Sequence, residues 1–220
     1  MPNSRTDEVA RYYAARAPDY DLTAGYTDAA AERLREPIKA RYRMLFEGRD
    51  VLEIACGTGY WTAVVGATAK SVLAIDIDES IIAAARSRCS HLPNITFQVD
   101  DAYLLQGVRR TFNAAFAHWW WSHIPKSRIR DFITTLHGRL EPGALVLFAD
   151  QLPYDWPDRR LDGEGNSLET RTLPDGRKFE IVKNFPSAIE LTDTLCGFAD
   201  DLRYIERPDE GNWELTCFSR

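Results

Sequence analysis

The sequence predicts an α/β domain built on a mostly parallel sheet, and three features carry this prediction. Short apolar runs alternate along the chain with segments in which apolar residues recur at helical spacing. A glycine-containing turn links the first of these runs to a helix-like segment, as at the start of nucleotide-binding βαβ units. The last two runs, 201–207 and 213–219, are joined by a five-residue link, which predicts a closing antiparallel hairpin.

Length and composition bound the possible functions. The chain has 220 residues, enough for one domain with a full core, and its net charge of −6 offers no broad basic surface for nucleic acid. No apolar run approaches the roughly 18 residues of a membrane span. The cysteines are scattered and none forms a C-x-x-C pair: Cys56, Cys89, Cys196 and Cys217. We therefore expect a cytoplasmic protein with reduced thiols and with no metal, membrane or nucleic-acid partner.

The glycine turn lies in residues 51–62, which read VLEIACGTGYWT. Gly57 and Gly59 accept positive φ and let the backbone approach a ligand, which a side chain would prevent. Glu53 lies in the preceding strand, and we expect it to point at whatever the turn holds. A dinucleotide fingerprint would need a third glycine, but Thr62 stands at that place.

A carboxylate ends the second predicted strand, residues 71–76. Asp76 lies 17 residues beyond Gly59, where a carboxylate can accept hydrogen bonds from both hydroxyls of a ribose. The alternative is that it only caps the next helix. We expect Asp78 to cap that helix and Asp76 to bind, with Ile77 against the adenine face.

Three consecutive tryptophans follow the predicted strand 111–118. Ligands of open parallel sheets bind beyond the carboxyl ends of the strands, so Trp119 and Trp120 are expected to wall an acceptor pocket, while at least one of the three packs in the core. His118 and His123 flank the run, and either can take a proton from an acceptor hydroxyl or amine. For His123 the alternative is a structural role in fixing the loop.

The spacing Glu53-x-Ala55-x-Gly57-x-Gly59 resembles the first motif of the class I S-adenosylmethionine-dependent methyltransferases. The resemblance covers roughly residues 50–150. It implies a Rossmann-like, seven-stranded, mostly parallel sheet with an antiparallel last strand and helices on both faces. It also implies S-adenosyl-L-methionine as cofactor, with the turn against its methionine part. Ala55 departs from the family, which often has glycine there.

The same resemblance assigns the residues after the third predicted strand to adenine. Asp101 and Ala102 match the family's Asp-Ala pair, whose carboxylate takes the adenine amino group. Asp100 stands where the family often has glycine, so which aspartate binds stays open. We count His118 with the cofactor-binding residues as well as with the catalytic candidates.

The N-terminal segment carries the pattern Tyr-Tyr-x-x-x-Ala-x-x-Tyr-Asp. In the family this pattern often helps to close the cofactor pocket, so Tyr13 and Tyr20 are expected to bind cofactor; the alternative is plain packing on the domain. Residues 28–47 predict a helix whose apolar face includes Leu34 and whose basic face, with Lys39 and Arg41, is solvated.

We expect a single domain in four parts: a helical lid (1–47), a cofactor-binding core (48–150), an acceptor-side insertion (151–185), and a closing helix and hairpin (186–220). The stretch 151–177 is rich in proline and glycine and is too long for a plain connection, and Tyr154 within it is expected to touch substrate. A short strand is predicted at 178–183.

The sequence thus predicts a methyltransferase that acts on the oxygen or nitrogen of a small-molecule acceptor. One alternative is an NAD(P)-dependent oxidoreductase, which shares the glycine turn and the acidic residue after the second strand. The other is a protein that binds S-adenosylmethionine without catalysis. The acceptor, the use of a general base, and the oligomeric state (monomer or homodimer) stay open.

Overall fold

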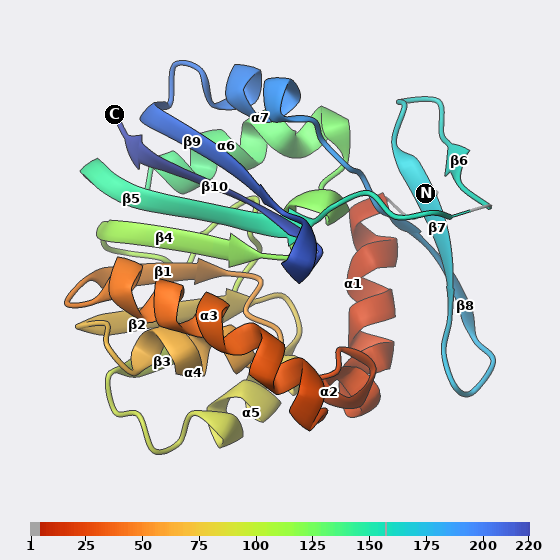
Figure 1. Cartoon of the computed structure of the whole chain (residues 1–220), viewed down its shortest axis with the longest axis horizontal. Coiled ribbons are helices and arrows are strands. Elements are labelled where there is room, and N and C mark those ends of the chain that lie inside the picture. Colours follow the sequence, from red (N-terminus) through yellow and green to blue (C-terminus); the bar gives the residue numbers. More distant parts are fainter. Residues whose placement is uncertain (1–4, 157) are drawn as a thin grey trace.

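A seven-stranded sheet forms the centre of the protein, in the order β3-β2-β1-β4-β5-β10-β9 (Figure 1). The computed structural model describes residues 5–156 and 158–220, so residues 1–4 of the predicted lid lie outside it. The strands are β1 (Asp50–Ile54), β2 (Ser71–Asp76), β3 (Ile95–Val99), β4 (Phe112–His118), β5 (Leu140–Gln151), β9 (Ala199–Arg207) and β10 (Asn212–Ser219). Within this sheet β10 runs opposite to the other six strands, which confirms the predicted fold class.

Helices cover both faces of this sheet (Figure 1). One face carries α3 (Ala29–Phe46), α4 (Tyr60–Gly66) and α5 (Glu79–Arg88); the other carries α6 (Ile129–His137) and α7 (Ala188–Leu195). Strand β4 serves both cores, because Ala114 and Phe116 face the first set of helices while Ala115 and Ala117 face the second. A strand buried on both faces is apolar where it is covered, which explains the apolar run 114–117 in the middle of β4.

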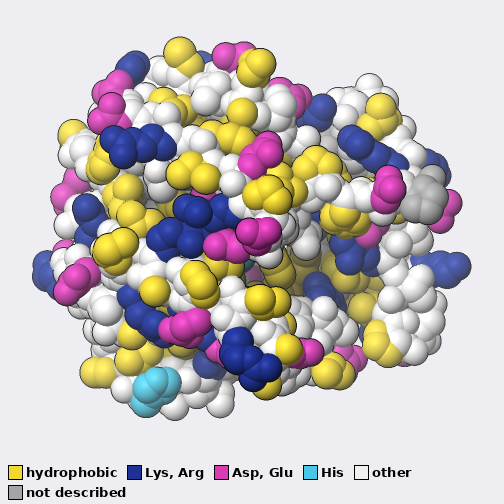
Figure 2. Space-filling model, viewed as in Figure 1, with side chains coloured by type: hydrophobic (Ala, Val, Ile, Leu, Met, Phe, Trp, Pro, Cys, Tyr) yellow, Lys and Arg dark blue, Asp and Glu magenta, His cyan; other side chains and the backbone are white. Residues whose placement is uncertain are grey.

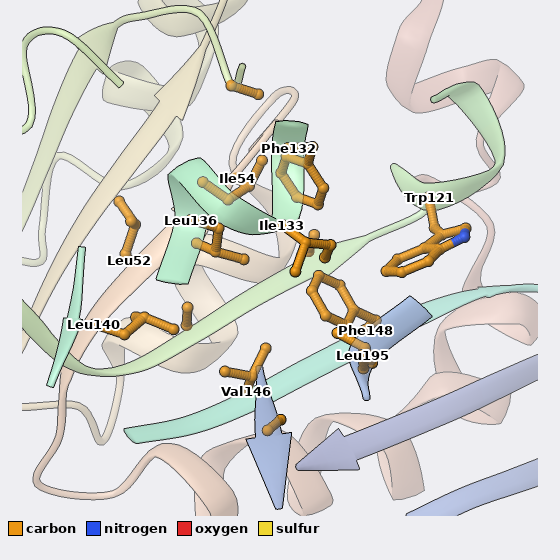
Figure 3. Packing of buried hydrophobic residues seen from close by; sticks show 14 of the residues in the cluster. Leu52, Ile54, Trp121, Phe132, Ile133, Leu136, Leu140, Val146, Phe148 and Leu195 are labelled. Atoms are coloured by element: carbon orange, nitrogen blue, oxygen red, sulfur yellow. The ribbon is translucent and has the colours of Figure 1, made fainter. Parts of the chain in front are cut away.

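The core beneath α6 is rich in aromatic side chains (Figure 3). The Trp121 ring meets Phe148 of β5 edge to face, with centroids 4.9 Å apart, and Phe132 of α6 packs against the same Phe148 ring. Trp121 is therefore the tryptophan of the triplet that belongs to the core, as the sequence predicted for at least one of them.

The N-terminal helices cross the carboxyl ends of the parallel strands (Figure 1). They are α1 (Arg5–Arg16), the 3₁₀ turn η1 (Ala17–Asp19) and α2 (Tyr20–Thr23); further 3₁₀ turns are η2 (Trp121–His123), η3 (Lys126–Arg128) and η4 (Pro208–Glu210). Beyond α1 lies a small antiparallel sheet of β6 (Arg160–Leu161), β7 (Ser167–Thr172) and β8 (Lys178–Val182). Val9 and Tyr12 of α1 pack on Phe179 and Ile181 of β8 in a hydrophobic cluster of their own.

The small sheet and α3 depart from the sequence predictions. Of its three strands only β8 was expected, because β6 and β7 are short, polar and paired only to each other and to β8. On α3, Leu34 is 71% exposed rather than packed. The basic face is not solvated: Lys39 is buried, and Arg41 binds Glu210 and Glu214. Those carboxylates come from the closing hairpin, so no local pattern could reveal the pairing.

The surface carries both signs of charge side by side in the view of Figure 2. All four cysteines are free thiols. Within residues 5–156 and 158–220, no helix is both long and apolar enough to cross a bilayer. The same residues hold no group of three His, Cys, Asp or Glu side chains suited to a metal ion.

Candidate active site

A cavity of about 920 Å³, its open mouth included, lies between α1 and the carboxyl ends of β1, β2 and β4. It brings together twelve of the fifteen residues that the sequence predicted for the site: Tyr13, Tyr20, Ala55, Gly57, Asp76, Ile77, Asp101, Ala102, His118, Trp119, Trp120 and His123. These residues come from five separate segments of the chain. Parallel strands end at one edge of the sheet, so the topology itself gathers them.

The glycine turn forms the floor of the cavity. Ala55, Gly57 and Gly59 have φ values of 53°, 56° and 79°, in the left-handed region that favours glycine. A side chain on Gly59 would place its Cβ 3.0 Å from the Cβ of Ala85 on α5, so this glycine permits the close approach of turn and helix. Gly59 therefore supports the turn from behind rather than lining the cavity.

Asp76 is the carboxylate in the cavity wall nearest to the turn. Its Oδ2 accepts a 3.0 Å hydrogen bond from the Gly57 amide, and its Oδ1 accepts one from the Asp78 amide. Burial raises the pKa of Asp76 to about 6, although the backbone hydrogen bonds act to lower it. Asp78 itself caps α5 by accepting from the amides of Ser80 and Ile81, so the predicted capping role is confirmed.

Glu53 lies beneath the turn and does not line the cavity. It is 2% exposed, and its Oε2 accepts no hydrogen bond from the described residues. Burial, aided by the negative charge of Asp76, raises the pKa of Glu53 to about 8, although the Thr62 side chain acts to lower it. Glu53 is therefore protonated at neutral pH and supports the turn from inside the protein, instead of pointing at a ligand as the sequence predicted.

Two aspartates after β3 line the cavity, but their oxygens differ in availability. Both oxygens of Asp100 are used within the protein, by the amides of Asp101 and Gly107 and by Gln98. Asp101 accepts only from the Tyr103 amide, through Oδ1, so its Oδ2 is left for a ligand as far as the described residues show. The sequence left open which of the two aspartates binds, and among the described residues Asp101 is the one with an oxygen that accepts no hydrogen bond.

The first two tryptophans of the triplet form one wall. Trp119 has a φ of 59°, which is uncommon for a bulky side chain, and its Nε1 donates to Oδ1 of Asn212 on β10. Trp120 lies 5.9 Å from the Tyr103 ring, and its Nε1 is shielded from solvent without a hydrogen-bond partner among the described residues. Together they close the β4 end of the cavity with aromatic surface.

The two candidate histidines are both held by tyrosines. His123 Nε2 lies 2.7 Å from the Tyr13 hydroxyl, and its Nδ1 lies 2.8 Å from the carbonyl oxygen of Val182. His118 Nδ1 lies 3.0 Å from the Tyr42 hydroxyl. Burial is the main cause that lowers both histidine pKa values, to about 3 for His118 and well below 6.5 for His123, so both rings are neutral.

Helices α1 and α2 form the wall of the cavity opposite the glycine turn. Tyr20 lies over the glycine turn: its hydroxyl is 3.6 Å from the point where a Gly57 Cβ would stand. Asp21 accepts a 2.6 Å hydrogen bond from Thr58 of the turn and pairs with Arg88 of α5. The segment is thus tied to the turn that it covers.

Tyr154 lies away from the cavity and joins Glu53 and Gly59 as the predicted site residues that do not line it. Its hydroxyl donates to Glu169 of the small sheet, and the residue does not line the cavity. The chain beyond β5 leads to the small sheet, where Glu169 of β7 accepts the hydrogen bond of Tyr154. The sequence predictions also missed several lining residues, among them Thr6, Asp7, Ala10 and Tyr103. Tyr103 directly follows Asp101-Ala102 and was within reach of prediction, whereas the α1 residues were not.

Known proteins match both the sequence and the fold. A family model described as a methyltransferase domain matches residues 51–143. A probable S-adenosylmethionine-dependent methyltransferase of Mycolicibacterium smegmatis is 38% identical over 176 residues, which cover 76% of this chain and 62% of that protein. The solved structure of a DhpI-SAH complex has a TM-score of 0.77 and 32% sequence identity, and the match covers 100% of this chain and 98% of that one. The chain belongs to the class I S-adenosylmethionine-dependent methyltransferases.

Another relative is phosphoethanolamine N-methyltransferase 1 of Caenorhabditis elegans, 33% identical over 89 residues. The match covers 40% of this chain and only 19% of that protein. The match to the M. smegmatis relative likewise spans less than two thirds of that protein. Family membership and the geometry of the cavity agree, since the glycine turn that carries the family's first motif forms the cavity floor.

Proposed function

We propose that the protein transfers a methyl group from S-adenosylmethionine to an oxygen or nitrogen of a small-molecule acceptor. The observation that carries the proposal is the single cavity in which the glycine turn, Asp76 and Asp101 meet. When bound, S-adenosylmethionine supplies an activated methyl group, so the protein has to bind, orient, exclude water and manage a proton.

The residues present suit this cofactor. Asp76 has the position to accept from the ribose hydroxyls, and Oδ2 of Asp101 is free to accept from the adenine amino group. Ile77, half exposed and lining the cavity, offers an apolar surface for the adenine ring, and Ala102 lies beside it in the wall. The bare Gly57 leaves room between the turn and Tyr20. Nε1 of Trp120, which has no hydrogen-bond partner among the described residues, is a further donor that a ligand could satisfy.

The acceptor side is formed by Trp119 and Trp120 together with the Tyr13–His123 pair. The aromatic wall excludes water and suits a sulfonium by cation–π attraction, worth roughly 0.5–2 kcal/mol. Tyr154 takes no part, because it lies outside the cavity. The C. elegans relative is named for phosphoethanolamine, and a small polar acceptor of that size is consistent with a cavity that the cofactor has to share.

Tyr13 and His123 form a route for the acceptor's proton. The Val182 carbonyl oxygen can only accept, so Nδ1 of His123 carries the ring proton and Nε2 accepts the hydrogen bond of the Tyr13 hydroxyl. Tyr13 can then take a proton from the acceptor as it passes its own to Nε2. His118 does not share this role, because the Tyr42 hydroxyl occupies its Nδ1 and its Nε2 carries the ring proton.

Calorimetry with S-adenosylhomocysteine and with NADH tests the proposal. We expect micromolar binding of S-adenosylhomocysteine and no binding of NADH; the reverse result would support an oxidoreductase. Methyl transfer is then measured with a panel of small hydroxyl and amine acceptors, phosphoethanolamine included. Tight cofactor binding with no transfer to any member of a broad panel would favour a non-catalytic binding protein.

A further inference from the structure

His118 and Tyr42 form a buried pair in which the position of each proton can be worked out. Tyr42 is 0% exposed, and its hydroxyl has His118 Nδ1 as its hydrogen-bond partner, 3.0 Å away. Burial raises the pKa of Tyr42 well above 10, so the phenol keeps its proton and has to donate it. Nδ1 of His118 is therefore the acceptor, and the neutral ring carries its proton on Nε2.

This N–H is left without an acceptor. Nε2 of His118 is shielded from solvent and makes no hydrogen bond within the described part of the chain, although the residue lines the cavity. Contacts with two large rings restrict the imidazole from turning to find one, because its centroid lies 4.3 Å from that of Trp61 and 5.2 Å from that of Trp119. A buried donor without a partner is costly, and such groups in native proteins need an explanation.

The two histidines of the cavity thus have opposite tautomers. His123 presents a lone pair at Nε2, because the Val182 carbonyl oxygen holds its proton at Nδ1. His118 presents an N–H at Nε2, because the Tyr42 hydroxyl occupies its Nδ1. One ring can accept a proton, while the other can only donate a hydrogen bond to a ligand.

The strand order indicates which part of the proposed cofactor would reach His118. Along the sheet edge the order β3-β2-β1-β4 gives Asp101, then Asp76, then the glycine turn, then His118. A cofactor with its adenine at Asp101 and its ribose at Asp76 continues past the turn with its methionyl part toward β4. That part carries the only carboxylate of S-adenosylmethionine.

The charge of one arginine also reaches the His118 ring. The positive charge of Arg35 is a second cause that lowers the pKa of His118, so the guanidinium is close enough to act on the ring. Arg35 does not line the cavity itself: it donates to the carbonyl oxygens of Ala24 and Gly25, and its guanidinium carbon lies 5.1 Å from the centroid of the Tyr26 ring. The methionyl end of the cavity therefore offers a neutral N–H donor on a ring that also lies in the positive field of Arg35.

We propose that Nε2–H of His118 donates to a carboxylate oxygen of the cofactor's methionyl part, and that Tyr42 is the positioning residue that fixes this tautomer. The inference rests on the proposed function, since it takes S-adenosylmethionine as the ligand. It assigns His118 to cofactor binding and removes it from the candidates for the general base.

Nitrogen-15 NMR of the ligand-free protein tests the tautomer alone. Protonated and unprotonated imidazole nitrogens resonate far apart, so the spectrum identifies the proton-bearing nitrogen of each ring. We expect Nε2–H for His118 and Nδ1–H for His123, and we expect the His118 Nε2–H signal to shift when S-adenosylhomocysteine is added. A proton on Nδ1 of His118 would overturn the inference whatever the protein binds.

Calorimetry with two ligands tests the contact. S-adenosylhomocysteine has the amino-acid part, and 5′-methylthioadenosine lacks it but keeps the nucleoside. His118→Phe should lower the affinity for S-adenosylhomocysteine by about 10- to 100-fold, as expected for the loss of a hydrogen bond to a charged group. Its affinity for 5′-methylthioadenosine should stay within about threefold of the wild-type value. His118→Gln, which restores a side-chain N–H donor, should recover part of the loss.

Tyr42→Phe tests the positioning role, with Tyr12→Phe as a matched loss of a phenol hydroxyl far from His118. We expect Tyr42→Phe to lower the affinity for S-adenosylhomocysteine but not for 5′-methylthioadenosine, and by less than His118→Phe does. The reason is that the variant removes the hydroxyl that holds Nδ1 of His118 as the acceptor. Equal losses for both ligands, or no loss for either, would overturn the inference. Wild-type protein that binds neither ligand would instead overturn the proposed function, and the inference would fall with it.

Discussion

The backbone amide of Gly57 donates a 3.0 Å hydrogen bond to Oδ2 of Asp76, so the glycine turn after β1 and the carboxylate that ends β2 are held in one arrangement. β1 and β2 are parallel neighbours with Ile54 opposite Ile75, which brings their carboxyl ends together. The hydrogen bond leaves Asp76 with lone pairs on both oxygens for further donors. The cavity wall is therefore organised before any ligand arrives.

Removal of the Asp76 carboxylate should abolish most cofactor affinity. We expect Asp76→Ala to lower the affinity for S-adenosylhomocysteine by about 100-fold or more, because two hydrogen bonds from the ribose to a charged acceptor are lost. Calorimetry measures the effect. Asp78→Ala is the control: it removes the α5 cap and about 1 kcal/mol of stability, but should keep affinity within a few fold. Unchanged affinity in Asp76→Ala would remove the basis of the proposed function.

The stability of the ligand-free protein should fall as pH rises through neutrality, because of Glu53. Its pKa is 4.5 in an unfolded chain and about 8 when buried, so the unfolded state loses its proton first. Stability is therefore highest below about pH 4.5 as far as this group is concerned, declines up to about pH 8, and is level above.

Glu53→Gln isolates this contribution. The variant retains the slope that comes from Asp76, whose pKa of about 6 confines it to lower pH. Urea unfolding at several pH values between about 6.5 and 9 should show wild-type stability decreasing and the variant changing less. Parallel profiles over this range would show that Glu53 is ionised in the folded protein.

A methyl group at Gly59 should be far more damaging than one at another left-handed glycine. Gly59 has a φ of +79° and its Cβ would lie 3.0 Å from the Cβ of Ala85, whereas Gly143 has a φ of +78° and open space around it. We expect Gly143→Ala to cost about 1–2 kcal/mol from backbone strain alone. Gly59→Ala adds overpacking of about 1–3 kcal/mol. Denaturant unfolding compares them, and equal losses would contradict the close approach.

Loss of the Tyr13 hydroxyl should slow turnover without weakening cofactor binding. Tyr13→Phe keeps the ring that lines the cavity but breaks the 2.7 Å hydrogen bond to His123. We expect kcat to fall about 100-fold or more on the acceptor that the panel identifies, with S-adenosylhomocysteine affinity within about threefold. The control is Tyr12→Phe, whose ring packs on Phe179 instead. Full activity in Tyr13→Phe would exclude the pair from proton transfer.

The sequence predictions were accurate where a feature depends on residues close in the sequence, and they were wrong where it depends on residues far apart. The first two strands and the cap at Asp78 depend on neighbours a few residues away, and the structure has them where the local pattern put them. Arg41 was predicted as a solvated surface residue, yet it binds Glu214 some 173 positions later. A helical period reveals which residues share a face, but it does not reveal what that face meets.

The sequence by itself determined the fold class, the glycine turn and the order in which the site residues meet along the sheet edge. These depend on local periodicity, backbone freedom and the rule that parallel strands end together. Only the tertiary structure decided the chemistry of each side chain. Tyr42 and Val182 assign opposite tautomers to two histidines that look alike in the sequence, and burial makes Glu53 a neutral support rather than a ligand contact. Proton positions and pKa values depend on partners brought from distant segments, and no stretch of sequence contains both members of such a pair.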